Sequence, residues 1–277
     1  MNKFSADTAI GIVTCNRQDF LKILLDSLDF SVGDVYILNA GDDLTLGKEL
    51  DNVKEVLTCD RKPTPVGHAK NKLLRHMRHS GKKYLFLIED DVKIKDNKVF
   101  EKYITTAAET GLWAGQLSYG RHGGVKGGNV RPDGVSNVKD TVQYENCSVD
   151  LYPQSFQAFT LYHANTLKIL GYFDDFYINA AEHLDHYYKA YQLGLGVNFW
   201  WFPDIENSGD YIEDIDQNHS NSVIRSGPDW KSNMTKSWMW FKKKYGGFPS
   251  ELPCASKEKV LERLEFLEQN YNQKQLL

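Results

Sequence analysis

Residues 84–91 read Tyr-Leu-Phe-Leu-Ile-Glu-Asp-Asp, an apolar run that ends abruptly in three acids. An uninterrupted run of this length, with aromatic members, predicts a strand that is buried on both faces. The carboxylates at its end cannot be buried without partners, because removing charge from water is costly. They are therefore expected to lie in water at the rim of a sheet or to hold a hard divalent cation, whose preferred ligands are carboxylate oxygens. Taken alone, the pattern favours a solvated acidic turn, which is common.

The sequence before this run alternates between predicted strands and helices. The apolar residues 10–14 lead into a polar turn in which Asn16 is suited to cap a helix. The leucines that follow recur at helical spacing: Leu21, Leu24, Leu25 and Leu28. Further apolar runs lie at 35–38 and at about 53–57, and a basic helix that opens at 67–71 leads into the run at 84. This alternation predicts a parallel α/β sheet.

Polar residues gather where these predicted strands end. In parallel α/β sheets, ligands bind beyond the carboxyl ends of the strands. The residues expected at those ends are Thr14, Asn16, Asn39, Asp42, Glu89, Asp90 and Asp91. The sequence therefore predicts a ligand site along this edge of the sheet.

Four motifs follow one another along the chain. The first is Thr14-Cys15-Asn16-Arg17 with the leucine-rich helix behind it, the second runs from Gly67 to Asn71, and the third is the acid triplet 89–91. The fourth is Gly171-Tyr172-Phe173-Asp174-Asp175, followed by Glu182-His183-Leu184-Asp185 and then Gly194. In this order they resemble the motifs of GT-A glycosyltransferases of the family 2 type, over roughly residues 8 to 200.

The resemblance implies an α/β fold of the GT-A type, a Rossmann-like mixed sheet that is flanked by helices and binds a nucleotide. It implies a metal-dependent, inverting transferase that moves a hexose or pentose from a nucleotide-diphosphate sugar, with UDP expected as the nucleotide. The acceptor would be a hydroxyl on a glycan, a glycolipid, a protein or modified DNA. Asp91 would bind Mn2+ or Mg2+, and His219 is a candidate further ligand. The residues that would contact the donor are Thr14, Asn16, Arg17, Asn39, Asp42, Lys70, Asn71, Glu89 and Asp90.

The chain departs from the family pattern at two positions. The family usually has aspartate where this chain has Asn39, which bears on the base of the nucleotide, and where it has His183, which bears on the catalytic base. Glu182 and Asp185 lie three residues apart and so share a face of a predicted helix. Acids at a helix start also fit a solvated end that the helix dipole favours. We expect one of these two acids to be the general base, with Asp185 ahead because the family uses aspartate, and His183 is the alternative.

Two further segments have open interpretations. Residues 118–140 are rich in glycine and form either a substrate-gating loop or a surface excursion. The aromatic run 199–202 predicts a strand that most often belongs to a core, although one of its rings would also suit stacking on a sugar.

We divide the chain into a GT-A catalytic domain at 1–225 and a helical appendage at 226–277. Within the catalytic domain, 1–95 form the nucleotide-sugar half and 96–225 the acceptor half. The appendage carries tryptophans among lysines and a predicted helix with Val260, Leu261, Leu264 and Leu267 at helical spacing. It is expected to pack on the catalytic domain as an ordinary tail or to form a homodimer contact. Its basic, aromatic character also suits a membrane surface or a nucleic acid strand.

Composition agrees with a globular enzyme. The 277 residues are 41% hydrophobic and 25% charged, with a net charge of −4, so no global charge attracts nucleic acid or an anionic membrane. The four cysteines show no metal-ligand spacing, which favours reduced thiols in the cytoplasm. No apolar stretch is long enough to span a bilayer, and we expect no signal peptide before Ala9. The expected location is cytoplasmic, free or at a membrane surface.

Two other functions compete with glycosyl transfer. A sugar-phosphate nucleotidyltransferase would also use an α/β sheet, a metal and paired acids, but residues 14–17 lack the Gly-rich basic loop that such enzymes need. A non-catalytic module that binds sugar or nucleic acid would bind its ligand without turnover and without a metal.

Overall fold

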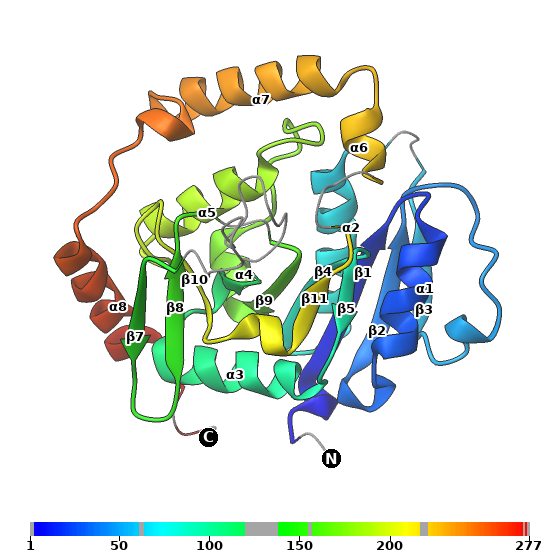
Figure 1. Ribbon diagram of the computed structural model, residues 1–277, viewed down its shortest axis with the longest axis horizontal. Helices are drawn as coiled ribbons and strands as arrows, with labels where there is room; N and C mark the ends of the chain where they lie inside the picture. Colours follow the sequence, from blue (N-terminus) through cyan, green and yellow to red (C-terminus); the bar gives the residue numbers. More distant parts are fainter. Residues whose placement is uncertain are drawn as a thin grey trace.

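The computed structural model of the protein describes residues 3–60, 64–119, 138–154, 157–216, 221–273 and 275. Its centre is a six-stranded sheet with the strand order β3-β2-β1-β4-β9-β6 (Figure 1). The strands are β1 (Thr8–Thr14), β2 (Asp34–Asn39), β3 (Glu55–Thr58), β4 (Tyr84–Glu89), β6 (Ala114–Ser118) and β9 (Phe159–His163). Strands β1 to β4 run parallel, whereas β9 is antiparallel to both β4 and β6. The mixed α/β sheet predicted from the sequence is confirmed.

Strand β4 lies in the middle of this sheet and is covered on both sides. All of its apolar residues are at most 2% exposed, as the uninterrupted apolar run predicted. Helices α1 (Gln18–Ser27) and α3 (Lys98–Thr110) pack on one face. Helices α2 (Val66–His79), α4 (Ala164–Leu170) and α5 (Glu182–Gln192) pack on the other. Because successive side chains of a strand point to opposite faces of the sheet, each strand contributes residues to both of these separate cores.

Helix α2 approaches the sheet closely because of a glycine in β1. A Cβ atom at Gly11 would lie 2.6 Å from the Met77 side chain and 2.8 Å from that of Leu73. A larger residue at this position would have to displace the ends of these two side chains. The amino-terminal end of α2, which carries Lys70, is thereby held beside the carboxyl ends of β1 and β4.

Two smaller sheets complete the strands. One has the order β10-β8-β7, from β10 (Phe202–Ile205), β8 (Ser148–Tyr152) and β7 (Asp140–Gln143). The other pairs β5 (Val92–Ile94) with β11 (Ile212–Asp214) in antiparallel fashion. Since β5 directly follows Asp91, and Ile215 N donates a 2.9 Å hydrogen bond to Asp91 O, this pairing brings residues 214–216 beside the acid triplet.

The C-terminal part consists of α6 (Val223–Ser226), α7 (Trp230–Tyr245) and α8 (Lys257–Tyr271). Helix α7 crosses the top of the molecule in Figure 1, above α5 and beyond the carboxyl ends of the parallel strands. Helix α8 packs against α3, and its apolar residues Val260, Leu264 and Leu267 belong to the core on the α1 and α3 face. The expected packing of this segment on the rest of the chain is therefore seen, while a homodimer contact stays a prediction.

Two local predictions were wrong. In the aromatic run 199–202 only Phe202 begins a strand, because Trp200 adopts a left-handed backbone conformation (φ 70°) that ends any extended run before it. Asn16 does not cap α1. It also has a positive φ of 55°, and its side-chain oxygen instead accepts a 2.6 Å hydrogen bond from Asp42 N. Of the Gly-rich segment, residues 120–137 lie outside the described residues.

Among the described residues, no helix combines the length and apolarity that crossing a bilayer requires.

Candidate functional site

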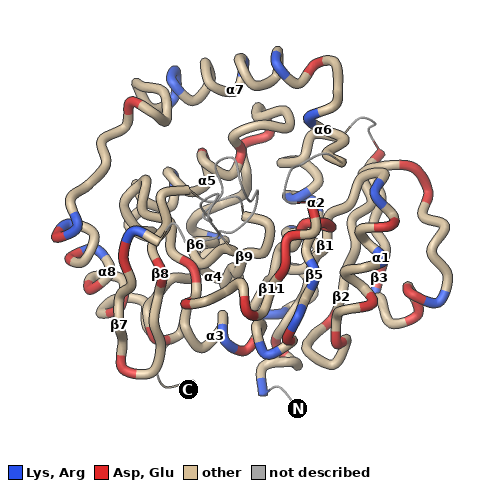
Figure 2. The backbone as a smooth tube through the Cα atoms, in the orientation of Figure 1, with Lys and Arg blue, Asp and Glu red and all other residues tan. Residues whose placement is uncertain are grey.

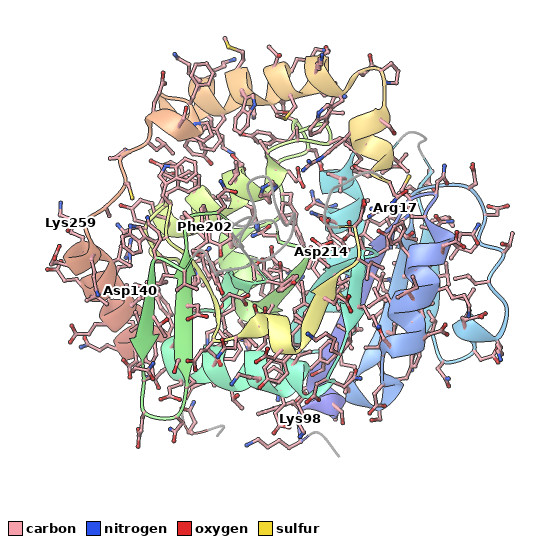
Figure 3. All side chains as sticks on the ribbon, in the orientation of Figure 1. Arg17, Lys98, Asp140, Phe202, Asp214 and Lys259 are labelled. Atoms are coloured by element: carbon pink, nitrogen blue, oxygen red, sulfur yellow. The ribbon has the colours of Figure 1, made fainter. Side chains whose placement is uncertain are left out.

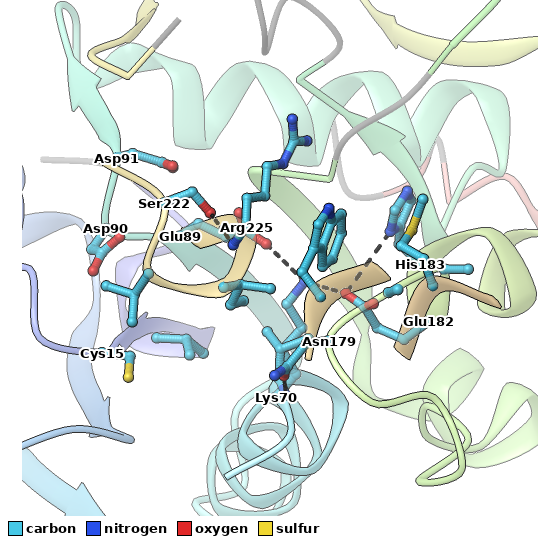
Figure 4. Close-up of a pocket in the computed structure, with 18 of the residues that line it drawn as sticks. Cys15, Lys70, Glu89, Asp90, Asp91, Asn179, Glu182, His183, Ser222 and Arg225 are labelled. Atoms are coloured by element: carbon cyan, nitrogen blue, oxygen red, sulfur yellow. Dashed lines mark hydrogen bonds and ion pairs between the residues drawn. The ribbon is translucent and has the colours of Figure 1, made fainter. Parts of the chain in front are cut away.

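A cavity of about 340 Å³ opens at the carboxyl ends of β1 and β4, below α6 and α7 (Figure 4). It is bounded by the start of α2, the start of α5 and the C-terminal helices. Figure 3 shows the side chains that fill much of the space between α7 and the elements below it. The polar and charged residues that line the cavity are Thr14, Arg17, Lys70, Glu89, Asp90, Asp91, Asn179, Glu182, His183, Ser222 and Arg225.

Asp90 lies at the centre of the cavity wall that is nearest the sheet. The two parallel strands place Val13 opposite Glu89, so the end of β1 lies directly beside the acid triplet. Thr14 Oγ1 donates a 2.7 Å hydrogen bond to Asp90 Oδ2. Burial raises the pKa of Asp90 to about 7, helped by the charge of Asp91, while Arg17 and the Thr14 hydrogen bond act in the opposite direction.

Arg17 joins three carboxylates. Its guanidinium donates to Asp90 Oδ1 through Nη2, and its Nη1 lies 3.1 Å from Asp91 Oδ2 and 3.6 Å from Asp216 Oδ2. Burial alone would lower the pKa of Arg17, but the charges of Asp90, Asp91 and Glu89 raise it well above the ordinary value. Arg17 is therefore a permanent cation among these acids. Figure 2 shows acidic residues gathered where β4, β5 and β11 meet.

The donor set beside Arg17 fits a hard divalent cation. Asp91 is 4% exposed, and its Oδ1 atom is buried with no hydrogen-bond partner among the described residues. Asp216 shares Arg17 Nη1 with it. The described residues contain no group of three or more His, Cys, Asp or Glu side chains arranged for a metal. A Mg2+-like ion normally takes one or two carboxylates and completes its shell with phosphate and water, so two acids suffice. His219 lies outside the described residues.

Lys70 connects the two sides of the cavity floor. Its ammonium group, on a residue that is 1% exposed, lies 2.8 Å from Glu89 Oε1 and 3.3 Å from Glu182 Oε1. Burial would lower the pKa of Lys70, but the two carboxylates raise it. Burial would raise the pKa of Glu182, but the charge of Lys70, together with His183, holds it far below the ordinary value. Both groups are therefore charged at neutral pH.

The start of α5 places Glu182 and His183 at the cavity. The preceding Ala181 has a left-handed conformation (φ 63°), which turns the chain sharply into the helix. His183 Nδ1 lies 3.8 Å from Glu182 Oε1, and Figure 4 shows both side chains on the side of the cavity away from the acid triplet. Both of these predicted site residues therefore reach the cavity.

Asp185 does not line this cavity. It is 1% exposed, and its Oδ1 accepts hydrogen bonds from Lys244 Nζ (2.7 Å), Tyr245 OH (2.9 Å) and Tyr177 OH (3.1 Å). Since Lys244 and Tyr245 are in the last turn of α7, the carboxylate fixes that helix on α5. This placement argues against Asp185 as the base, because the residue does not line the cavity and its Oδ1 already accepts from α7 and Tyr177.

Asp174 makes a second attachment for α7. Its Oδ2 accepts hydrogen bonds from Trp240 Nε1 (3.0 Å) and Lys244 Nζ (3.1 Å). We refer to Asp174, Asp185, Lys244 and Tyr245 as the α7 clasp. The clasp holds the C-terminal half of α7, and its N-terminal half extends over the cavity.

Two predicted donor residues, Asn39 and Asn71, have structural partners instead. Asn39 spans its own turn, donating to Asp42 O (2.6 Å) and accepting from Gly41 N (3.0 Å). Asn71 is buried and ties α2 to the 171–175 segment, with hydrogen bonds to the Phe173 backbone and to Asp175. Asp42 and Asn16 line a second, more open hollow of about 520 Å³ beside Arg17. A nucleotide contact for these residues stays a prediction.

Several lining residues were not predicted. Arg225, Trp230, Met234 and Trp238 come from the part of the chain beyond β11, and Asp216, which pairs with Arg17, directly follows that strand. A signal existed for three of them, because residues 230, 234 and 238 recur at intervals of four and so share one face of a helix. Figure 4 shows Arg225 between the acid triplet and the Glu182–His183 pair.

Comparison of the fold with solved structures gives consistent neighbours. No family model matches the sequence, and no curated protein sequence matches it. The mannosyltransferase PcManGT from Pyrobaculum calidifontis, solved with GDP-Man and Mn2+, superposes with a TM-score of 0.55 at 11% identity, over 96% of this chain and 70% of that one. TarS 1-349 from S. aureus superposes with a TM-score of 0.51 at 15% identity, over 95% and 83%. The chain shares its fold with a glycosyltransferase. At these identities the likeness establishes the fold alone.

Proposed function

We propose that the protein is a metal-dependent glycosyltransferase that moves a sugar from a nucleotide diphosphate to an acceptor hydroxyl. The observation that carries the proposal is one cavity, at the carboxyl ends of parallel strands, with Asp90 and Asp91 on one side and Glu182 and His183 on the other. The fold neighbour solved with GDP-Man and Mn2+ supports this class of donor. We expect UDP as the nucleotide and inversion at the transferred carbon.

The residues around the acid pair would bind the diphosphate. A bound Mn2+ or Mg2+, held by Asp91 and Asp216, would act as a Lewis acid that neutralises the leaving diphosphate. Arg17 and Arg225 supply positive charge on the same side of the cavity, and guanidinium groups suit bidentate contacts with phosphate. Asp90, which accepts hydrogen bonds from Thr14 and Arg17, would hold the Arg17 guanidinium beside the phosphates.

The proton of the acceptor hydroxyl needs a base on the opposite side. Glu182 is a weak base, because its ion pair with Lys70 keeps its pKa low. Asp185 is turned away from the cavity into the α7 clasp. We therefore propose His183 as the base, with the Glu182 carboxylate 3.8 Å from its Nδ1. His183 stands where the resembling family has its aspartate.

A transfer assay with a panel of nucleotide-sugar donors tests the proposal. UDP- and GDP-sugars are incubated with Mn2+, with EDTA, and with mixed acceptors, and release of UDP or GDP is measured. His183→Ala should lower turnover about 10²- to 10⁴-fold, while the melting-temperature shift caused by UDP or GDP with Mn2+ stays as in the parent protein. Release of diphosphate from UTP and a sugar 1-phosphate would instead identify a nucleotidyltransferase. Ligand binding without turnover of any donor would identify a non-catalytic module.

A further inference from the structure

The cavity has two chemically different walls. The wall formed by β1, β4 and α2 carries charged side chains, among them Arg17, Lys70 and the acid triplet. The wall formed by α6, α7 and the first turn of α5 is apolar apart from Arg225, Glu182 and His183 at its boundary. Its apolar members are Leu184, Val223, Ile224, Trp230, Met234 and Trp238. We call these six residues the apolar wall.

The apolar wall is a fixed part of the site. Trp230, Met234 and Trp238 are spaced by four residues along α7, so they form one stripe on the side that faces the cavity. Trp238 packs beside the buried Tyr177 and Phe241, and the α7 clasp holds the last turn of the same helix.

The composition of this wall restricts what it can bind. Aliphatic side chains make no hydrogen bonds, so a group covered with hydroxyls, or a phosphate, would lose its water there without compensation. The two indole rings offer flat faces that suit a sugar ring. Leu184, Ile224 and Met234, in contrast, gain only from an apolar group. The wall therefore suits a ligand with both a ring and an apolar portion and without charge.

Exposed apolar side chains continue from the wall to the protein surface. Val223, a member of the wall, is 41% exposed, and Ile178, next to the cavity-lining Asn179, is 38% exposed. The apolar wall therefore reaches the protein surface at Val223.

We propose that the apolar wall is the acceptor subsite and that the acceptor is a neutral amphiphile, a hydroxyl-bearing sugar ring joined to an apolar group. The word acceptor rests on the proposed glycosyltransferase function, whereas the binding preference rests on the wall alone. His183 precedes Leu184 at the boundary of the two walls, so a ring that lies against the indoles presents its hydroxyl beside the proposed base.

Binding of simple probes to the full chain tests the preference without any need for transfer. The probes are octyl β-D-glucoside below its micelle concentration, methyl β-D-glucoside, glucose 6-phosphate and thymidine, each titrated by calorimetry. We expect octyl glucoside to bind at least about tenfold more tightly than methyl glucoside, which burial of two methylene groups would provide. Glucose 6-phosphate and thymidine should bind more weakly than octyl glucoside.

Two methionines of α7 provide a matched control. Met234 is in the wall, whereas Met239 is 57% exposed and is not among the residues that line the cavity. Met234→Ser and Trp230→Ala should each weaken octyl glucoside about fivefold or more, and Met239→Ser should leave it unchanged. The inference would be overturned if Met234→Ser and Met239→Ser lost octyl glucoside affinity equally. It would also be overturned if the protein bound glucose 6-phosphate or thymidine more tightly than octyl glucoside. If the probes bind as expected but no donor sugar is transferred, the proposed function fails while the binding inference stands.

Discussion

Replacing Asp185 with asparagine separates two roles for this carboxylate. If Asp185 were the general base, the substitution would remove the proton acceptor and leave the fold unchanged. The structure instead gives it three donors, two of which belong to the last turn of α7. We therefore expect Asp185→Asn to loosen α7, and with it the apolar wall over the cavity, while a base at His183 remains in place.

The size of the effect follows from the three hydrogen bonds. Asparagine keeps the volume and one acceptor oxygen, but it converts bonds to a charged group into neutral ones, at a cost of about 1 kcal/mol each. The Lys244 side chain is 30% exposed, so hydration of its ammonium group offsets part of the free energy lost at that hydrogen bond. A loss of about 2 to 3 kcal/mol in the free energy of unfolding results, which corresponds to a fall in melting temperature of roughly 3 to 6 °C for a chain of this size.

Thermal unfolding measures the loss of stability, and acceptor titrations measure the effect of a loosened apolar wall on acceptor binding. Lys244→Met removes the charged partner from the opposite side of the same contact. It should reproduce the lower melting temperature and a raised KM for the acceptor, while donor binding stays normal. The reasoning is refuted if Asp185→Asn has an unchanged melting temperature and loses about 10²-fold or more in turnover at saturating acceptor, while Lys244→Met retains full activity.

Three further predictions concern the metal site, pH and the C-terminal helix. Asp91→Asn should lower Mn2+ affinity by about tenfold or more in calorimetry, and an unchanged Mn2+ titration would remove Asp91 from the site. Burial lowers the pKa of His186 from 6.5 to about 3, so the unfolded chain binds a proton before the folded chain does as the pH falls. The free energy of unfolding should therefore drop by about 2 kcal/mol between pH 6.5 and pH 5. Denaturant titrations measure this loss, and His186→Gln should not show it. Leu264→Ala should cost about 2 to 4 kcal/mol, because Leu264 is 2% exposed in the core beside α3. Leu261→Ala, at a position that is 37% exposed, is its control and should cost less than about 1 kcal/mol.

Much of the fold was accessible from local patterns. The run 84–88 predicted a doubly covered strand, and the alternation before it predicted the parallel half of the sheet, because side-chain burial follows the period of each element. The aromatic run 199–202 failed as a strand prediction because Trp200 has a positive φ, which a bulky aromatic residue rarely adopts and which its residue type therefore does not predict.

The sequence by itself determined that acids and polar side chains would meet at one edge of a parallel sheet, since parallel strands must end on the same side. Only the tertiary structure decided which of them face the cavity. Glu182 and Asp185 are indistinguishable by spacing, yet the docking of α7, about sixty residues further along the chain, turns Asp185 into an anchor and leaves Glu182 at the site. Trp230, Met234 and Trp238 likewise reach the cavity only because α7 is fastened across it. Such contacts depend on the whole packed arrangement, and no local periodicity encodes them.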